Sequence, residues 1–150
     1  MMQRLLDEAE PTQVYVTLSA PTKEVYQKTC NPLIPDQWEM MVKSLEILTK
    51  FKRSTIRMTL VKGLNMLDPE SYAKLLLKYP VKFIELKAAM AVGYSRYRME
   101  YSSMPLHSEI KDFAEKICNL TGLKIIDEKP NSRVVLLMKE DFKERRLNFD

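Results

Sequence analysis

Charged side chains recur inside stretches of this sequence that otherwise have the composition of β-strands. Arg57 lies among apolar residues in one stretch, and Glu85 and Lys87 alternate with apolar residues in another. Successive side chains of a strand point to opposite faces, so each stretch has an apolar face and a polar face. Burying an unpaired charge is costly. We therefore expect the polar face to border water, a ligand or a polar network.

A third stretch contributes hydroxyl groups to the same expected face. Thr17 and Ser19 alternate there with apolar residues. In a βα barrel the chemistry takes place at the carboxyl ends of the strands, where such side chains gather. A second interpretation stays open, because a sheet covered on one face alone alternates in the same way. In that case Arg57 and Glu85 form an incidental cross-strand pair on a solvated face.

A basic and aromatic segment, Tyr94-Ser95-Arg96-Tyr97-Arg98, follows the third of these stretches. Guanidinium groups bind phosphate, and aromatic rings stack on an extruded RNA base. The net charge of +4 and pI near 9.0 permit a polyanionic partner without requiring one. The alternative is an exposed basic loop with no ligand. The basic residues from Lys139 to Arg146 alternate with acidic ones and predict a solvated helix face.

Short β-rich stretches alternate with amphipathic helical ones, which favours crossover connections and a parallel sheet. Apolar spacing and capping signals predict helices at 2–9, 37–51, 107–121 and from Pro69, and Asp36 with Glu39 predicts a capping box. Strands are predicted at 14–20, 54–61 and 81–88, followed by a hairpin of 123–126 and 133–138. The fold class is therefore α/β, with parallel strands, crossover helices and a C-terminal β-hairpin.

Length and composition limit the possibilities. The 150 residues suit a single domain spanning 1–150. With neither a membrane-spanning run nor a signal peptide, we expect a cytoplasmic protein with no membrane partner. The two cysteines, Cys30 and Cys118, are too few and too far apart for a disulfide framework or a zinc or iron–sulfur site.

Four segments together resemble the second half of the archaeal tRNA wyosine synthases, radical S-adenosylmethionine enzymes also called 4-demethylwyosine synthases. They are VYVTLSAPT (14–22), IRMTLVKGLN (56–65), KFIELKAAMAVGYSRYRM (82–99) and MPLHSEI (104–110). The resemblance implies the C-terminal half of a partial (βα)6 barrel, with a family-specific region at about 90–150. It also implies formation of 4-demethylwyosine from N1-methylguanosine of tRNA-Phe with pyruvate.

The resemblance also assigns roles to residues. Thr17, Ser19, Arg57 and Asn65 would face S-adenosylmethionine, although the family often has Asp at the position of Ser19. Glu85 and Lys87 would project towards the substrate as catalytic groups. The residues expected to contact RNA are Lys62, Tyr94, Arg96, Tyr97 and Arg98.

The family's cluster-binding CxxxCxxC motif has no counterpart in this sequence. We therefore expect no cofactor or metal on this chain alone, with S-adenosylmethionine and a [4Fe–4S] cluster in the complete enzyme. The strand beginning at Val14 would be an exposed edge, to be covered by the N-terminal half of the barrel or by self-association. The competing hypothesis is a non-catalytic tRNA-binding module.

Overall fold

A five-stranded mixed sheet organises the chain. The computed structural model describes residues 1–147. The strands are β1 (Val14–Thr17), β2 (Ser54–Leu60), β3 (Phe83–Ala88), β4 (Lys124–Lys129) and β5 (Val134–Met138). Their order is β1-β2-β3-β5-β4, with β1 to β3 parallel and the β4–β5 hairpin joined antiparallel to β3 through β5. β1 is therefore one edge of the sheet, as the sequence predicts.

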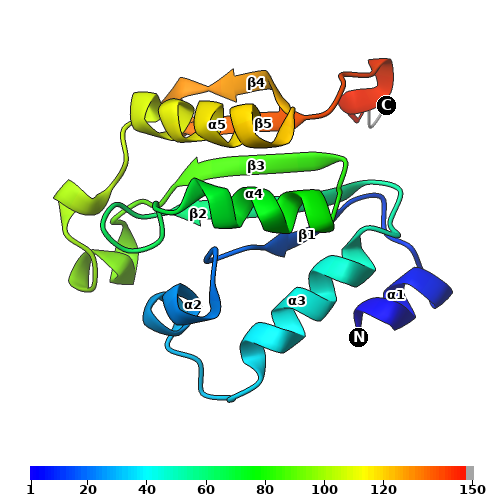
Figure 1. Ribbon diagram of the computed structural model, residues 1–150, viewed down its shortest axis with the longest axis horizontal. Helices are drawn as coiled ribbons and strands as arrows, with labels where there is room; N and C mark the ends of the chain where they lie inside the picture. The colour runs from blue at the N-terminus through cyan, green and yellow to red at the C-terminus, as the bar shows by residue number, and fades with distance from the viewer. Residues whose placement is uncertain (148–150) are drawn as a thin grey trace.

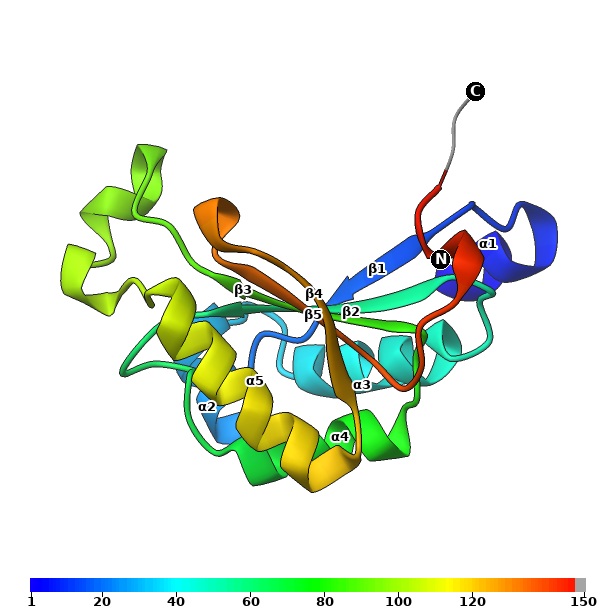
Figure 2. The ribbon, with the colours of Figure 1, turned by 90° about the horizontal axis from the view of Figure 1, so that it is seen from above.

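Helices cover one face of this sheet. They are α1 (Met2–Glu8), α2 (Lys23–Cys30), α3 (Gln37–Leu48), α4 (Pro69–Lys78) and α5 (His107–Thr121). Figures 1 and 2 show α2 to α5 in one layer, with α1 beside the start of β1. The opposite face carries no helical layer in the described part of the chain (Figure 2). Three short 3₁₀ turns, Gly93–Tyr97, Tyr101–Ser103 and Pro130–Ser132, lie at the end of the sheet where β1 to β3 finish, and a fourth, Lys143–Arg145, lies near the C-terminus.

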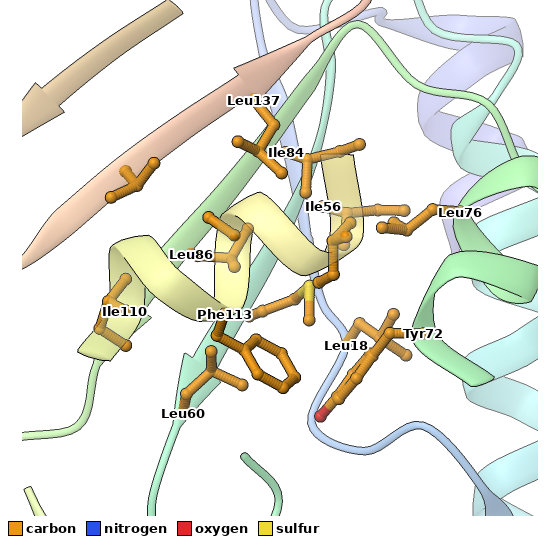
Figure 3. Close-up of a cluster of buried hydrophobic side chains, with 14 of the residues drawn as sticks. Leu18, Ile56, Leu60, Tyr72, Leu76, Ile84, Leu86, Ile110, Phe113 and Leu137 are labelled. Carbon is orange, nitrogen blue, oxygen red and sulfur yellow. The ribbon is translucent and has the colours of Figure 1, made fainter. Parts of the chain in front are cut away.

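The core forms where the apolar strand faces meet α3, α4 and α5 (Figure 3). In β2 the buried residues Ile56, Met58 and Leu60 alternate with the half-buried Arg57 and Thr59. The other buried side chains of this layer include Leu18, Leu45, Leu48, Tyr72, Leu76, Ile84, Leu86, Ile110, Phe113, Ile117 and Leu137. The predicted alternation of polar and apolar faces is thus confirmed.

Several details differ from the sequence prediction. Asp36 precedes α3 but makes no side-chain cap, and Glu39 pairs instead with Lys23 on α2. Pairing of β1 ends at Thr17, three residues before the predicted end. The sequence interpretation also omitted α2, although Thr22 caps it by accepting from the Val25 amide and an acidic residue, Glu24, follows in the first turn.

Candidate functional site

An ion pair lies at the centre of the open face. The strand register places Arg57 beside Glu85, and the guanidinium donates to both carboxylate oxygens at 3.2 and 3.3 Å. The same guanidinium lies 4.5 Å from the centre of the Tyr15 ring. The Glu85 side chain is 17% exposed, so its carboxylate is largely buried beside a cationic partner. A sheet covered on one face alone predicts this Arg57–Glu85 pair. In a βα barrel, the same face would be the one that carries the chemistry.

Lys87 and the two hydroxyl residues of β1 share this face. The register puts Lys87 beside Thr59, and Thr17 beside Arg57. Among residues 1–147, Lys87 makes no ion pair within 4.0 Å. Ser19 follows β1 and is half-buried. The structure therefore brings Thr17, Arg57, Glu85 and Lys87 onto one polar surface.

Asn65 lies beneath the carboxyl ends of β1 and β2 with 1% of its surface exposed. Its amide nitrogen donates to the carbonyls of Ser19 and Thr59 at 2.8 and 2.9 Å, and its Oδ1 accepts from the Val61 amide at 2.7 Å. The buried Tyr72 hydroxyl donates to the Asn65 carbonyl at 3.0 Å. Asn65 thus joins the ends of two strands. Its predicted contact with a cofactor stays a prediction.

Lys62, predicted to contact RNA, is held at the start of α5. Its amine donates to both oxygens of Glu109 at 3.0 Å. The Glu109 carboxylate also accepts from the backbone amide of Leu106. The hydrogen bond from the Leu106 amide is the largest cause that lowers the pKa of Glu109 below its usual range, and the hydrogen bond from Lys62 is the second. Lys62 consequently has a partner that limits its freedom to bind an anion.

The remaining predicted RNA-contacting residues lie on the exposed 3₁₀ turn Gly93–Tyr97 and just after it. Tyr94 and Tyr97 are 85% and 72% exposed, with ring centres 6.3 Å apart. The Arg96 guanidinium lies 5.0 Å from the Tyr97 ring centre and donates to its hydroxyl. Arg98 is also exposed. The turn lies beyond the carboxyl end of β3 (Figure 1). It therefore places these exposed aromatic and cationic groups at that end of the sheet.

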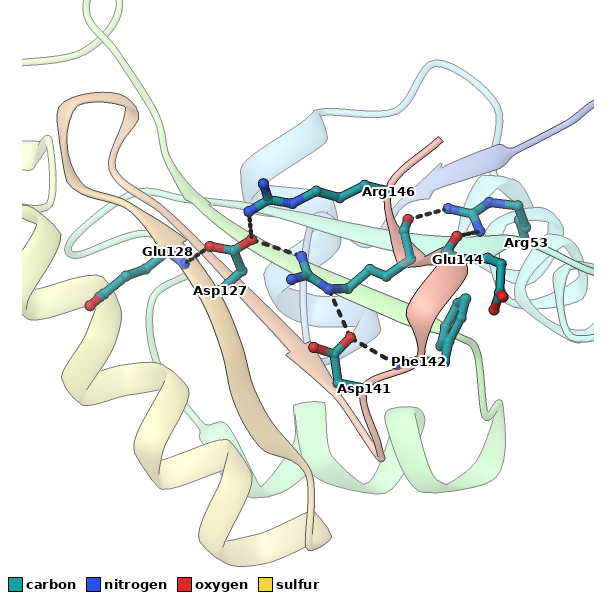
Figure 4. A network of polar contacts seen from close by, with 8 residues as sticks. Arg53, Asp127, Glu128, Asp141, Phe142, Glu144 and Arg146 are labelled. Atoms are coloured by element: carbon teal, nitrogen blue, oxygen red, sulfur yellow. Dashed lines mark hydrogen bonds and ion pairs between the residues drawn. The ribbon is translucent and has the colours of Figure 1, made fainter. Parts of the chain in front are cut away.

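A second polar cluster occupies the opposite, amino end of the strands. Residues 141–147, here called the strap, fold back over this end (Figure 4). Arg53 donates to the carbonyls of Glu144 and Arg145, and its guanidinium lies 4.9 Å from the Phe83 ring centre. Arg145 also contacts Asp127 at 2.7 Å and Asp141 at 2.8 Å.

The strap corrects part of the prediction of a solvated helix face at the C-terminus. Lys139, Lys143 and Arg146 are exposed as predicted, but the segment forms no α-helix and Arg145 is partly buried. The Arg145 side chain is 17% exposed and lies in a 3₁₀ turn. Hydrogen bonds from Arg145 and then from Arg146 lower the pKa of Asp127 below its ordinary value. A cavity of about 460 Å³ between the strap and the sheet is bordered by Tyr15, Phe83 and Leu136. Glu85 also borders this cavity, which therefore extends from the strap to the ion pair on the open face.

The cofactors implied by the resemblance fit the described residues unequally. Cys30 ends α2 and Cys118 lies on α5, and within residues 1–147 no three metal-binding side chains lie close together. This chain offers no set of three thiolates for a [4Fe–4S] cluster. The hydroxyls of Thr17 and Ser19 suit the ribose of a nucleoside, because each can donate and accept a hydrogen bond.

Comparison with known proteins relates this chain to one family. A family model described as wyosine base formation matches residues 79–139. The tRNA 4-demethylwyosine synthase of Pyrococcus horikoshii is 45% identical over 141 residues, which cover 93% of this chain and 41% of the relative. The synthase of Methanocaldococcus jannaschii is 37% identical over 93% of this chain and 44% of the relative. Both relatives are described as S-adenosyl-L-methionine-dependent.

Two solved structures share the fold. One, of TYW1 with a lysine-pyruvate adduct bound, superposes with a TM-score of 0.81 at 33% identity over 93% of this chain and 44% of that one. The other, of archaeal TYW1, gives a TM-score of 0.72 at 31% identity over 92% and 43%. None of the helices between residues 1 and 147 has the length and apolar character to cross a lipid bilayer.

The fold and the polar face define an α/β domain with one face of its sheet left open. More particularly, the chain is similar over 93% of its length to tRNA 4-demethylwyosine synthases, which confirms the resemblance seen in the sequence. It spans a little over two fifths of the length of these relatives.

Proposed function

We propose that this chain is the part of a tRNA 4-demethylwyosine synthase that holds one side of the reaction chamber and contacts tRNA. The complete enzyme would form 4-demethylwyosine from N1-methylguanosine in tRNA-Phe with pyruvate, in the cytoplasm. The observation that carries this proposal is the superposition on TYW1 over 93% of the chain, at a TM-score of 0.81. This chain alone would be inactive.

Glu85 and Lys87 are the proposed substrate-facing groups. Both lie on the open face of β3, and Glu85 is fixed by Arg57. A fixed carboxylate accepts hydrogen bonds from a substrate at little entropic cost. Lys87 has no ionic partner within residues 1–147, so its ammonium is available to a carboxylate such as that of pyruvate.

Thr17, Ser19, Arg57 and Asn65 are the proposed cofactor-facing residues. S-adenosylmethionine, bound with a [4Fe–4S] cluster held elsewhere in the enzyme, would supply the radical. The hydroxyls of Thr17 and Ser19 would bind the ribose. Asn65 would act by holding the Ser19 backbone, because its own amide is already hydrogen-bonded.

The RNA-contacting residues are proposed to lie on the segment after β3. Tyr94 and Tyr97 offer exposed rings for stacking, and Arg96 and Arg98 offer charges for phosphate. Lys62 would contribute from the loop after β2 if its pair with Glu109 opens.

The open face and the β1 edge would be covered in the complete enzyme. We propose that this sheet is half of a (βα)6 barrel and that the cluster-bearing half pairs with β1. Self-association through the same edge is the alternative. Either arrangement would enclose Arg57, Glu85 and Lys87 in the barrel interior.

A chimaeric enzyme tests this function. Residues 11–140 would replace the matching segment of the Pyrococcus horikoshii synthase, which is 45% identical. We expect 4-demethylwyosine, detected by mass spectrometry of digested tRNA-Phe, and a loss of at least about 100-fold in rate with Lys87→Met. Lys129→Met, from the end of β4, serves as a matched control. A folded chimaera that binds tRNA and yields no product would overturn the proposal.

A second candidate, a non-catalytic tRNA-binding module, is favoured by the exposure of the 93–98 segment. It predicts that the isolated chain binds tRNA-Phe in a salt-dependent way and that Arg96→Ala weakens binding, whatever the chimaera does. Binding without product in the chimaera would select this function.

A further inference from the structure

A cleft of about 810 Å³ lies at the carboxyl end of the parallel strands. Its walls come from the last turn of α2, the loop after β2 and the segment after β3, including Lys28, Thr29, Gly63, Tyr94 and Arg98. Figure 1 shows α2 and the segment after β3 at the same end of the molecule. The volume lies in the range of small-molecule sites, about 300–1,000 Å³. The resemblance drew attention to two of these walls, through Lys62, Tyr94 and Arg98, but not to α2, which was not predicted.

Cations outnumber carboxylates in the lining of this cleft. Lys28 and Arg98 are both exposed, and neither forms an ion pair within residues 1–147. The third cation, Lys62, is paired with Glu109. The lining carboxylate, Glu100, accepts a hydrogen bond from the Ser102 hydroxyl. Two cations therefore remain for a ligand, one on each side of the cleft.

The wall also contains a hydroxyl without a partner. Thr29 Oγ1 is shielded from solvent and makes no hydrogen bond within residues 1–147. A buried polar atom in this state costs about 1–3 kcal/mol. Thr29 borders the cleft, so a ligand oxygen that reaches this hydroxyl could accept a hydrogen bond from it.

We propose that this cleft binds one phosphodiester group of the RNA substrate between Lys28 and Arg98, with Thr29 as an additional hydrogen-bond donor. The inference rests on the proposed function and extends its RNA surface onto α2. Lys and Arg are the usual partners of backbone phosphates, which position RNA without reading its sequence. S-adenosylmethionine suits the cleft less well, because its sulfonium and ammonium groups would meet two cations. Tyr94, on the rim, is placed to stack on a base next to the bound phosphate.

The salt dependence of binding tests this subsite. Fluorescence anisotropy would follow binding of tRNA-Phe transcript to the chain between about 50 and 200 mM salt. For K28Q/R98Q we expect roughly tenfold weaker binding at the low-salt end, as for loss of a charge-assisted phosphate contact. The slope of log K against log salt should fall by about 0.7, the value for one phosphate of a single strand. Each single variant should lose nearly as much, because both cations serve one phosphate.

The control removes the same two charges elsewhere. Lys74 on α4 and Lys116 on α5 are exposed and lie outside the cleft, so K74Q/K116Q corrects for net charge. Thr29→Val should weaken binding about twofold without lowering Tm, since it removes an unpaired hydroxyl.

Each other outcome overturns the subsite. A slope for K28Q/R98Q equal to that of the control excludes a phosphate contact at the cleft, and a fall near 1.4 indicates two separate phosphates. Competition by S-adenosylmethionine for the cleft would identify a different ligand. Absence of RNA binding by the unaltered chain also refutes the subsite. The proposed activity is judged independently, by product formation in the chimaera.

Discussion

Different interactions stabilise the two ends of the parallel strands. At the carboxyl end, the buried amide of Asn65 joins backbone groups of β2 and of the segment after β1, and Tyr72 connects it to α4. At the amino end, the partly exposed pair of Arg145 and Asp127 holds the strap. Buried neutral hydrogen bonds are insensitive to salt, whereas exposed ion pairs are screened. The contacts at the carboxyl end, where we propose that tRNA and cofactor meet, should therefore persist at salt concentrations that weaken the strap.

Asn65→Ala is expected to have the largest effect. It leaves the Val61 amide and the Ser19 and Thr59 carbonyls without their partner in a buried site. We expect a loss of about 3 kcal/mol in the free energy of unfolding, since each unpaired buried group costs about 1–3 kcal/mol and water can relieve part of it. Urea denaturation measures the change. Asn119→Ala, on the exposed side of α5, is the control, and a loss below about 1 kcal/mol would contradict the assigned role.

Tyr72→Phe should cost less, about 1–2 kcal/mol, because it removes one donor from the Asn65 carbonyl and keeps the ring in the core. Burial is the main cause that raises the pKa of Tyr72, so the hydroxyl stays protonated and acts as a donor. Unfolding of the double variant with Asn65→Ala should show a coupling of at least about 0.5 kcal/mol. Additive losses would mean that the two residues act separately. Tyr101→Phe, at an exposed position, controls for the loss of a hydroxyl.

The comparison also separates what the sequence could predict from what it could not. The alternation around Arg57, Glu85 and Lys87 identified the open face, because burial of one strand face imposes a period of two. The role of Asn65 could not be foreseen. Its partners are backbone groups of a neighbouring strand and loop, and no sequence pattern encodes their positions.

The strap and α2 were missed for different reasons. The alternating charges near Arg145 suit a solvated helix equally well, and only the position of Asp127 on β4 decides between the two. The short helix α2 has a cap at Thr22, but its eight residues are mostly polar and Tyr26 is the buried one among them. This omission concealed Lys28, which the proposed phosphate subsite requires.

Glu109→Gln tests a second contact at the carboxyl end of the strands, the ion pair between Lys62 in the loop after β2 and Glu109 in α5. The variant keeps an acceptor for the Leu106 amide but loses the negative charge. That charge pairs with Lys62 and interacts favourably with the helix dipole at the N-terminus of α5. We expect a loss of about 1 kcal/mol at pH 7. Because the folded-state pKa of Glu109 is lowered, its contribution is present above the unfolded value of about 4.3 and disappears as pH falls through the folded value. Urea denaturation should show a smaller difference in the free energy of unfolding between variant and parent at pH 3 than at pH 7. A difference that persists at pH 3 would assign it to packing.

Asp127→Asn should have the smallest effect on stability. It directly tests whether the contacts at the amino end of the strands depend on charge, unlike those at the carboxyl end. Asp127 is about one third exposed, so its pairs with Arg145 and Arg146 are worth roughly 0.5 kcal/mol, or about 1–2 °C in Tm at low salt. The folded-state pKa of Asp127 is lowered, so this stability is present above about pH 3.9 and is lost as pH falls through the folded value. In 1 M salt, where the Debye length is about 3 Å, the difference should shrink towards zero, whereas the loss caused by Asn65→Ala should persist. Differential scanning fluorimetry in both salts measures this. If the Asp127→Asn loss survived in high salt, the contacts of Asp127 with Arg145 and Arg146 would depend on hydrogen bonds that salt does not screen, and the two ends of the sheet would be held in a similar way.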